Sequence, residues 1–403
     1  LHDKGRFARG TSWRRLADAL FLTEPLWVVS SVLVVYLSVV LEASRQWMVA
    51  GLAVALLPFA LRLWQYRRLT QRTPFDLPIM LLLAGAGLGA WVSPKGEASL
   101  ESWLSLVAII CLYYTLVNYP RPRLLIKWGS VAGLLIACAI IVFTFSGSSY
   151  VSSPNWVNSW LFDVGASLPS LPQPGNYGAP LSLDTHGTDL TLAVAAAICL
   201  GVALFGRGWT LRGAALLGSI LLLGVTFANT DQSLLRLFSG ESLRGRMVLW
   251  QGTLDLMNGP QYITGLGLGY WPWAYNDGIV RTGFTHPHNA YVQLYSDTGV
   301  IGLLALALAL VVSAHLAWKV LRQGRGHPYF GLAVGIVLAT VVTLAVGVVE
   351  AAPTGIPVVA KEAYHYVISP AAFLLGGMLV VLHRLGLEGA GEASKEGGLR
   401  STS

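Results

Sequence analysis

Charged residues are scarce in this 403-residue chain: only 12% of the residues are charged, while 54% are hydrophobic. Disordered chains are polar and charge-rich, so the composition excludes disorder and argues against a single soluble core. The apolar residues form ten unbroken blocks of roughly 17–22 residues, and each block is long enough to cross a bilayer. A membrane barrel would show short alternating strands instead. The sequence therefore predicts an all-α polytopic membrane protein with about ten transmembrane helices.

Cysteine is also scarce. The three cysteines, Cys111, Cys138 and Cys199, lie inside apolar blocks, and none has a CxxC partner. This spacing predicts neither a disulfide framework nor a metal framework. We therefore interpret all three as small core residues.

Basic residues are distributed unevenly between the loops. Of the 27 Lys and Arg residues, all but seven fall in the terminal segments and the loops of one side. The exceptions are Arg45, Lys95, Arg236, Arg244, Arg246, Arg281 and Lys361. Because loops rich in Lys and Arg stay in the cytoplasm, the pattern predicts a multi-pass protein of the cytoplasmic (inner) membrane with both termini cytoplasmic. The same rule explains the net charge of +7 without nucleic acid as a partner.

The apolar blocks and loops divide the chain into five segments. The predicted spans are roughly 25–41, 47–64, 75–92, 99–118, 124–145, 188–206, 211–228, 299–320, 328–349 and 364–383. The predicted segments are a cytoplasmic N-terminal segment (1–24), a transmembrane bundle (25–228, with an outer loop at 146–187), an extracytoplasmic catalytic loop (229–298), C-terminal transmembrane helices (299–385) and a disordered tail (386–403).

The large outer loop begins with a predicted helix. Ser239 is suited to cap it, and Asn258-Gly259-Pro260 stops it. An apolar stripe recurs along it at spacings of four and three: Leu243, Met247, Trp250, Leu254 and Met257. The stripe predicts a helix that lies on the outer membrane boundary or packs on the bundle.

A glycine-rich turn and an aromatic cluster follow this helix. Residues 265–269 read Gly-Leu-Gly-Leu-Gly, and without a βαβ context we interpret them as a tight turn rather than a phosphate loop. Tyr270, Trp271 and Trp273 come next. They are candidates for sugar contacts, and the alternative is an aromatic belt at the membrane interface.

A histidine pair closes the loop. Pro287 suits the first turn of a helix, which places His288 near a helix N-terminus. His286 and His288 have no third or fourth ligand at metal-binding spacing, so we predict no metal site.

The residues around this pair resemble a known signature. His288-Asn289, followed after nine residues by Gly299-Val300-Ile301-Gly302, is similar to the H-[N/S/Q]-x9-G-x-x-G signature of bacterial O-antigen ligases. The order of residues 246–250, 265–267 and 286–289 also resembles the domain shared by the O-antigen ligase/polymerase superfamily. This likeness covers about residues 246–310, and the topology extends it over most of the chain.

The resemblance implies a membrane glycosyltransferase of cell-surface polysaccharide biosynthesis, including lipopolysaccharide. It implies a donor glycan on undecaprenyl diphosphate, an acceptor hydroxyl on a glycan, lipid A-core or protein, and no metal or other cofactor. The family's histidine corresponds to His288 and its loop arginine to Arg246, while Asn289, Gly299 and Gly302 complete the motif. A further family arginine beside an upstream span has no clean counterpart.

The residue types suit this chemistry. A diphosphate leaving group is bound well by arginine, and Arg246, Arg281 and Arg244 are the candidates for such a clamp. A neutral His288 imidazole can take the proton of an attacking hydroxyl. The alternatives from the residues alone are interface cations for the arginines and a helix-capping role for His288. A multi-span transporter of small anions or lipid-linked sugars is the alternative function, although its ionisable groups are expected nearer the bilayer midplane.

Overall fold

The structure is a computed structural model that describes residues 12–40, 45–126, 182–183, 185–229, 240–279, 286–348, 355–360 and 363–400. Its helices are α1 (Ser12–Val40), α2 (Arg45–Tyr66), α3 (Asp76–Val92), α4 (Gly96–Asn118), α7 (Thr185–Phe205), α8 (Trp209–Asn229), α10 (Gly240–Asp255), α11 (Gln261–Thr264), α12 (Tyr270–Asn276), α13 (Ala290–Gln323), α14 (Phe330–Gly347) and α15 (Ala371–Arg400). Its strands are β1 (Ser182–Leu183), β2 (Gly355–Ala360) and β3 (Ala363–Ile368).

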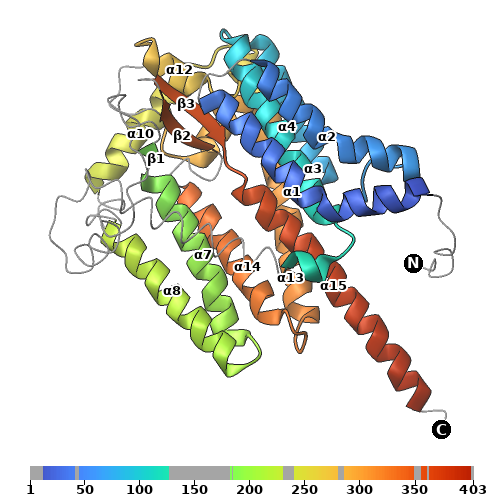
Figure 1. The fold of residues 1–403 in the computed structure, drawn as a ribbon. Coiled ribbons are helices and arrows are strands. Elements are labelled where there is room, and N and C mark those ends of the chain that lie inside the picture. Colours follow the sequence, from blue (N-terminus) through green and yellow to red (C-terminus); the bar gives the residue numbers. More distant parts are fainter. Residues whose placement is uncertain are drawn as a thin grey trace, which may run out of the picture.

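The long helices form two groups joined by a shared centre (Figure 1). Helices α7 and α8 pack together, and α14 packs on α7; on the other side α1, α2, α3 and α4 pack on one another. Helix α13 lies against α3, and α15 lies against α4 and α13, so these two helices connect the groups. The main hydrophobic core lies where they meet, around the buried residues Ile109, Leu316 and Leu379.

Small residues set the close approach of α7 to α14. A Cβ atom on Gly201 would lie 2.2 Å from the backbone nitrogen of Gly335, so neither helix could come this near with a larger residue. Membrane helices associate through such small residues because lipid tails offer no hydrophobic driving force for association. The pair of α7 and α14 is thus built by packing suited to a bilayer.

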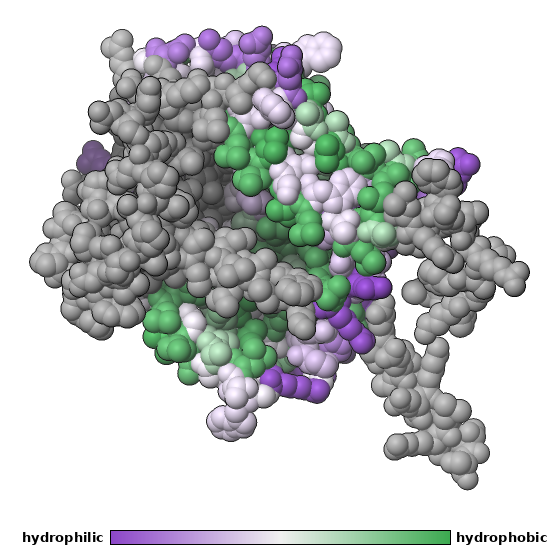
Figure 2. Space-filling view, in the orientation of Figure 1, coloured by the Kyte–Doolittle hydropathy of each residue, from purple (hydrophilic) through white to green (hydrophobic). Residues whose placement is uncertain are grey.

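Within the described part of the chain, five helical segments are long and apolar enough to cross a membrane: Ala19–Val39, Arg45–Tyr66, Gly96–Asn118, Ala290–Gln323 and Phe330–Gly347. Shorter apolar helical segments are Asp76–Val92, Thr191–Phe205, Trp209–Gly224 and Ala371–Gly386. Figure 2 shows hydrophobic residues over the helices, with hydrophilic residues gathered at the top and the lower edge of the view. The helical membrane architecture is therefore confirmed. The count of ten stays a prediction, because 124–145 lies outside the described residues except for 124–126.

A small sheet departs from the predicted all-α fold. Strands β2 and β3 form an antiparallel hairpin, and β1 pairs antiparallel with β2 through Ser182 opposite Val359. The predicted span 364–383 is therefore wrong at its start, since 363–368 is strand. Residues 355–360 and 363–368 are rich in β-branched and aromatic residues, and this composition favours strands over a helix.

The last helix also differs from the prediction. Helix α15 continues to Arg400, where we expected a disordered tail from residue 386. The segment beyond 386 has several glycines, but it also holds Leu, Ala, Glu and Lys, which are good helix formers. The helix that begins in the core therefore extends beyond its apolar part.

Helix α13 is kinked near its N-terminal end. Gly299 has φ 64° and ψ −160°, which are not helical values, so the segments before and after it are two helices joined at a kink. The predicted boundary between the outer loop and the span 299–320 falls at this residue. The break divides α13 into a short N-terminal part that begins beside His288 and a longer part, and the helix as a whole is long and apolar enough to cross a membrane.

Candidate functional site

Helix α10 presents one buried face to the rest of the protein. Arg246 is only 8% exposed, and Leu249 and Thr253 of the same face are buried too. These positions are three and four residues apart, so they lie on one side of the helix. Of the predicted apolar stripe, Met247 does not lie on this packed face, because it is 62% exposed. Arg246 belongs to the packed face, while Arg244 is exposed.

The turn that carries the two histidines is buried. His286 is 4% exposed and His288 is 8% exposed, and their ring centroids lie 4.1 Å apart. His288 has φ 49°, a left-handed conformation that is rare for residues other than glycine. Such backbone strain persists only where the surroundings hold it, and it is often found at functional sites.

A hydrogen bond links this turn to α10. Nε1 of Trp250 donates to the carbonyl oxygen of Pro287 over 3.0 Å. Trp250 lies four residues after Arg246, so both side chains project from the same side of α10. The side of α10 that carries Arg246 thus faces the residue next to His288. The sequence did not predict this contact, although the i, i+4 spacing of Arg246 and Trp250 was a signal for it.

The Trp250 contact gives a testable prediction. Trp250→Phe keeps an aromatic ring but leaves the Pro287 carbonyl without its donor, so we expect the free energy of unfolding to fall by about 1–3 kcal/mol. Thermal unfolding of the purified protein measures this loss. Trp91→Phe is the matched control, because Trp91 is 88% exposed and should tolerate the change. Equal stability of the two variants would contradict the anchoring role.

Asn289 caps the N-terminal part of α13. Its Oδ1 accepts from the backbone nitrogens of Tyr291 and Val292, each over 2.9 Å, and its Nδ2 donates to the carbonyl oxygen of Val348 over 2.8 Å. The amide therefore fixes the end of the His288 turn to α13 and to the end of α14. These two backbone donors are already used by Asn289, so they are not open to an anion.

The glycine-rich turn supports the break in α13. The break deprives the carbonyls of Ser296 and Asp297 of their usual helical donors, and the backbone nitrogens of Leu266 and Gly267 bind them instead, over 2.6 and 3.2 Å. A Cβ atom on Gly299 would lie 2.1 Å from the carbonyl oxygen of Ile263, so the turn requires glycine there. The predicted tight turn is confirmed, and its role is to complete the backbone bonds of α13.

The aromatic candidates are placed differently from one another. Tyr270 and Trp273 are partly exposed, with ring centroids 5.3 Å apart, and Nζ of Lys95 lies 4.6 Å from the Trp273 ring centroid. Trp271 is only 3% exposed, so its ring has no face open to a sugar. Lys95 was not among the predicted site residues, and nothing in the local sequence near it indicated its position over Trp273.

A buried polar pair inside α13 was also missed. Nε2 of Gln293 donates to both carboxyl oxygens of Asp297 over 2.9 Å, and both residues are 2% exposed or less. Their i, i+4 spacing was visible in the sequence. Asp297 also lines an apolar cavity of about 200 Å³, to which residues of α3, α4, α13, α14 and α15 contribute.

Comparison with known proteins finds a family that matches part of the chain. The family model described as O-Antigen ligase matches residues 184–307. The suspected likeness to the O-antigen ligase superfamily is therefore confirmed over this part of the chain. The match runs from the start of α7 into α13, and it includes both Arg246 and His288. No curated protein matches the chain.

The structure describes some of the predicted site residues and not others. Arg246, His288, Asn289 and the two motif glycines all lie in described, buried positions, whereas Arg281 lies outside the described residues. Gly302 packs inside its own helix, where a Cβ atom would lie 1.6 Å from Oγ1 of Thr298. Within the described residues, no group of three or more His, Cys, Asp or Glu side chains is placed to hold a metal ion.

Proposed function

We propose that the protein transfers a glycan from an undecaprenyl-diphosphate donor to an acceptor hydroxyl at the outer face of the cytoplasmic membrane. The observation that carries the proposal is the hydrogen bond from Trp250 to Pro287, which aligns the Arg246 side of α10 with the buried His288 turn. The family match over 184–307 supports the same class of reaction. A cation and an imidazole held on facing elements are what departure of a diphosphate and deprotonation of a hydroxyl require.

Arg246 is the proposed binding group for the leaving diphosphate. Its guanidinium stays charged at any physiological pH and offers a planar set of donors that matches phosphate oxygens. Because Arg246 is nearly buried, water screens its charge less than it screens the exposed Arg244. We therefore assign the main contact to Arg246, and secondary contacts to Arg244 and Arg281.

His288 is the proposed general base. As the acceptor oxygen bonds to the anomeric carbon, the bond from that carbon to the diphosphate breaks, and the hydroxyl proton passes to an imidazole nitrogen of His288. The negative charge that develops on the diphosphate is stabilised by Arg246. Direct displacement of this kind inverts the anomeric configuration.

Sugar contacts fall to the partly exposed aromatic pair. Tyr270 and Trp273 present ring surface, and Lys95 adds a donor beside them. We leave Trp271 out of this role because it is buried. Its Nε1 has no hydrogen-bond partner among the described residues, so the ring serves packing in this proposal.

The break in α13 bears on the transporter alternative, since transporters use broken helices near the bilayer midplane. Helix α13 has 34 residues, and the stretch after Gly299 alone is roughly 36 Å long, which is enough to cross the roughly 30 Å hydrocarbon layer. The break therefore lies at the membrane boundary. The cavity beside it is apolar, and its one charged lining residue is the acidic Asp297, which does not suit a small anion.

The test is a reconstituted reaction. Purified protein is incubated with an undecaprenyl-diphosphate glycan and with candidate acceptors, and we expect a product in which the glycan has moved to the acceptor. A longer lipid-linked chain indicates a polymerase, and a labelled lipid A-core indicates a ligase. Solute uptake by proteoliposomes without any transfer product would overturn the proposal in favour of transport.

A further inference from the structure

Basic side chains from several elements meet at the end of the bundle opposite to the His288 turn. Arg207, between α7 and α8, donates a hydrogen bond to the carbonyl oxygen of Gly326, between α13 and α14. Burial lowers the pKa of His327, and the nearby positive charges of Arg123 and Arg207 lower it further. Two other connections of the chain thus place the arginines Arg123 and Arg207 around the turn that carries His327.

A small pocket lies within this group. His327 and His383 both line it, and its volume of about 10 Å³ is close to that of one water molecule. Nδ1 of His383 is buried and has no hydrogen-bond partner among the described residues. Lys319 and His315 of α13 are electrostatic neighbours of His383. The pocket is therefore lined by two imidazoles whose electrostatic neighbours are positively charged.

The positive charge is not neutralised by nearby acids. Among the described residues, the electrostatic neighbours of His327 and His383 include no carboxylate. Arg384 is engaged elsewhere, because its guanidinium donates to Oε1 of Gln71 and to the carbonyl oxygen of Val117. Arg207 and Lys319 keep donors for a partner. An uncompensated cluster of this kind attracts an anion.

Apolar side chains next to the cluster indicate where that anion comes from. Trp209 is 89% exposed, Trp318 is 65% exposed and Phe205 is 49% exposed. Tryptophan is enriched where a membrane meets water, so this surface is suited to acyl chains as well as head groups. Phe205 also contacts Phe330 edge to face, which fixes the apolar surface to the α13–α14 turn. A soluble anion would leave these aromatic side chains in water.

We propose that this end of the bundle binds the phosphate head group of an anionic phospholipid from the adjacent leaflet, through Arg207, Lys319 and His327. The acyl chains of that lipid lie along Trp209 and Trp318. Basic pockets between membrane helices on the cytoplasmic side are a recurring site for such head groups. The site is separate from the proposed transfer reaction and does not depend on it.

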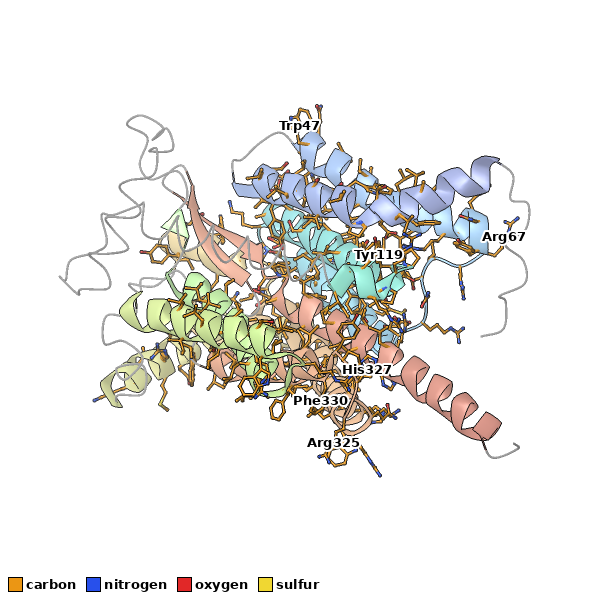
Figure 3. The ribbon with its side chains drawn as sticks, turned by 60° about the horizontal axis from the view of Figure 1, so that its bottom comes forward. Trp47, Arg67, Tyr119, Arg325, His327 and Phe330 are labelled. Carbon is orange, nitrogen blue, oxygen red and sulfur yellow. The ribbon has the colours of Figure 1, made fainter. Side chains whose placement is uncertain are left out.

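The test compares lipid retention by matched variants. Native mass spectrometry of protein from nanodiscs with equal phosphatidylglycerol and phosphatidylcholine measures the preference for the anionic lipid. Arg207→Gln with Lys319→Gln removes two cations from the site. Arg67→Gln with Arg68→Gln removes the same charge from the end of α2, and Figure 3 shows Arg67 well apart from His327.

We expect the wild type and the Arg67→Gln, Arg68→Gln variant to retain phosphatidylglycerol preferentially. In the Arg207→Gln, Lys319→Gln variant we expect this preference to fall by a factor of at least about five. An equal loss in both double variants, or no loss in either, would overturn the proposal. If inorganic phosphate raises the melting temperature in pure phosphatidylcholine as much as phosphatidylglycerol does, the site binds soluble anions and the lipid assignment is wrong. Should the double variant unfold, the single variant His327→Gln gives the same comparison with a smaller expected loss.

Discussion

His288→Asn is expected to reduce the rate of glycan transfer by about 10²-fold to 10⁴-fold, the usual contribution of a positioned general base. Asparagine is the informative replacement because it tolerates the left-handed backbone that His288 adopts at φ 49°. The variant therefore removes the imidazole without adding backbone strain. Initial rates of transfer from an undecaprenyl-diphosphate glycan measure the effect, and the melting temperature should stay close to that of the wild type.

The neighbouring ring supplies an internal check. Because the centroid of His286 lies 4.1 Å from that of His288, a residual rate in His288→Asn would come from His286, and the double asparagine variant should abolish it. Full activity in the double variant would remove both histidines from the mechanism.

Two substitutions of Arg246 are expected to lower the rate of glycan transfer by different amounts. Arg246→Ala should cost about 10²-fold to 10³-fold in rate, as the loss of a preorganised charge-stabilising donor does. Arg246→Lys should recover part of the rate, since it restores the charge but not the planar pair of donors. Arg45→Ala is the control for lost positive charge, because Arg45 is exposed at the start of α2. If Arg246→Ala and Arg45→Ala have the same rate, Arg246 does not bind the diphosphate.

Gly299→Ala is expected to destabilise the protein by on the order of 3 kcal/mol or more. Gly299 has φ 64° and ψ −160°, a region that is accessible essentially to glycine alone. A Cβ atom would also lie 2.1 Å from the carbonyl oxygen of Ile263, so α11 would have to move. The backbone strain and the clash both act on the kink that positions the N-terminal part of α13. Thermal unfolding in detergent measures the loss.

A second glycine provides the matched control. Gly213 lies inside α8, and no atom lies within 4 Å of where its Cβ would be. Gly213→Ala should therefore be neutral, or more stable by up to about 1 kcal/mol, because alanine favours a helix over glycine. A Gly299→Ala variant as stable as Gly213→Ala would show that the break in α13 is not fixed by this residue.

Most helices could be predicted from the sequence because long apolar blocks report directly on membrane crossing. The hairpin at 355–368 could not, since its apolar residues merge with those of α15 and a hydropathy average cannot separate a short strand from a helix start. The turn of residues 265–269 was predictable from its glycines, but its bonds to Ser296 and Asp297 depend on tertiary contact.

The candidate site, too, could be predicted from the sequence only in part. Motif spacing was enough to single out Arg246, His288 and Asn289, because residue type and order carry the resemblance. Burial was less predictable: the apolar stripe left open whether Met247 faces the membrane or the protein, and Met247 is exposed while Arg246 is buried. An apolar stripe can face either the protein or the lipid, and periodicity alone does not distinguish them.

The pairing of β1 with β2 brings together two places that are far apart along the chain. Ser182 lies opposite Val359, so the segment between them leaves and returns at neighbouring positions. A chimaera that exchanges residues 182–359 for those of a relative would need two junctions only about 5 Å apart, the spacing of paired strands. Acceptor preference can therefore be mapped by exchanging this whole segment as one piece.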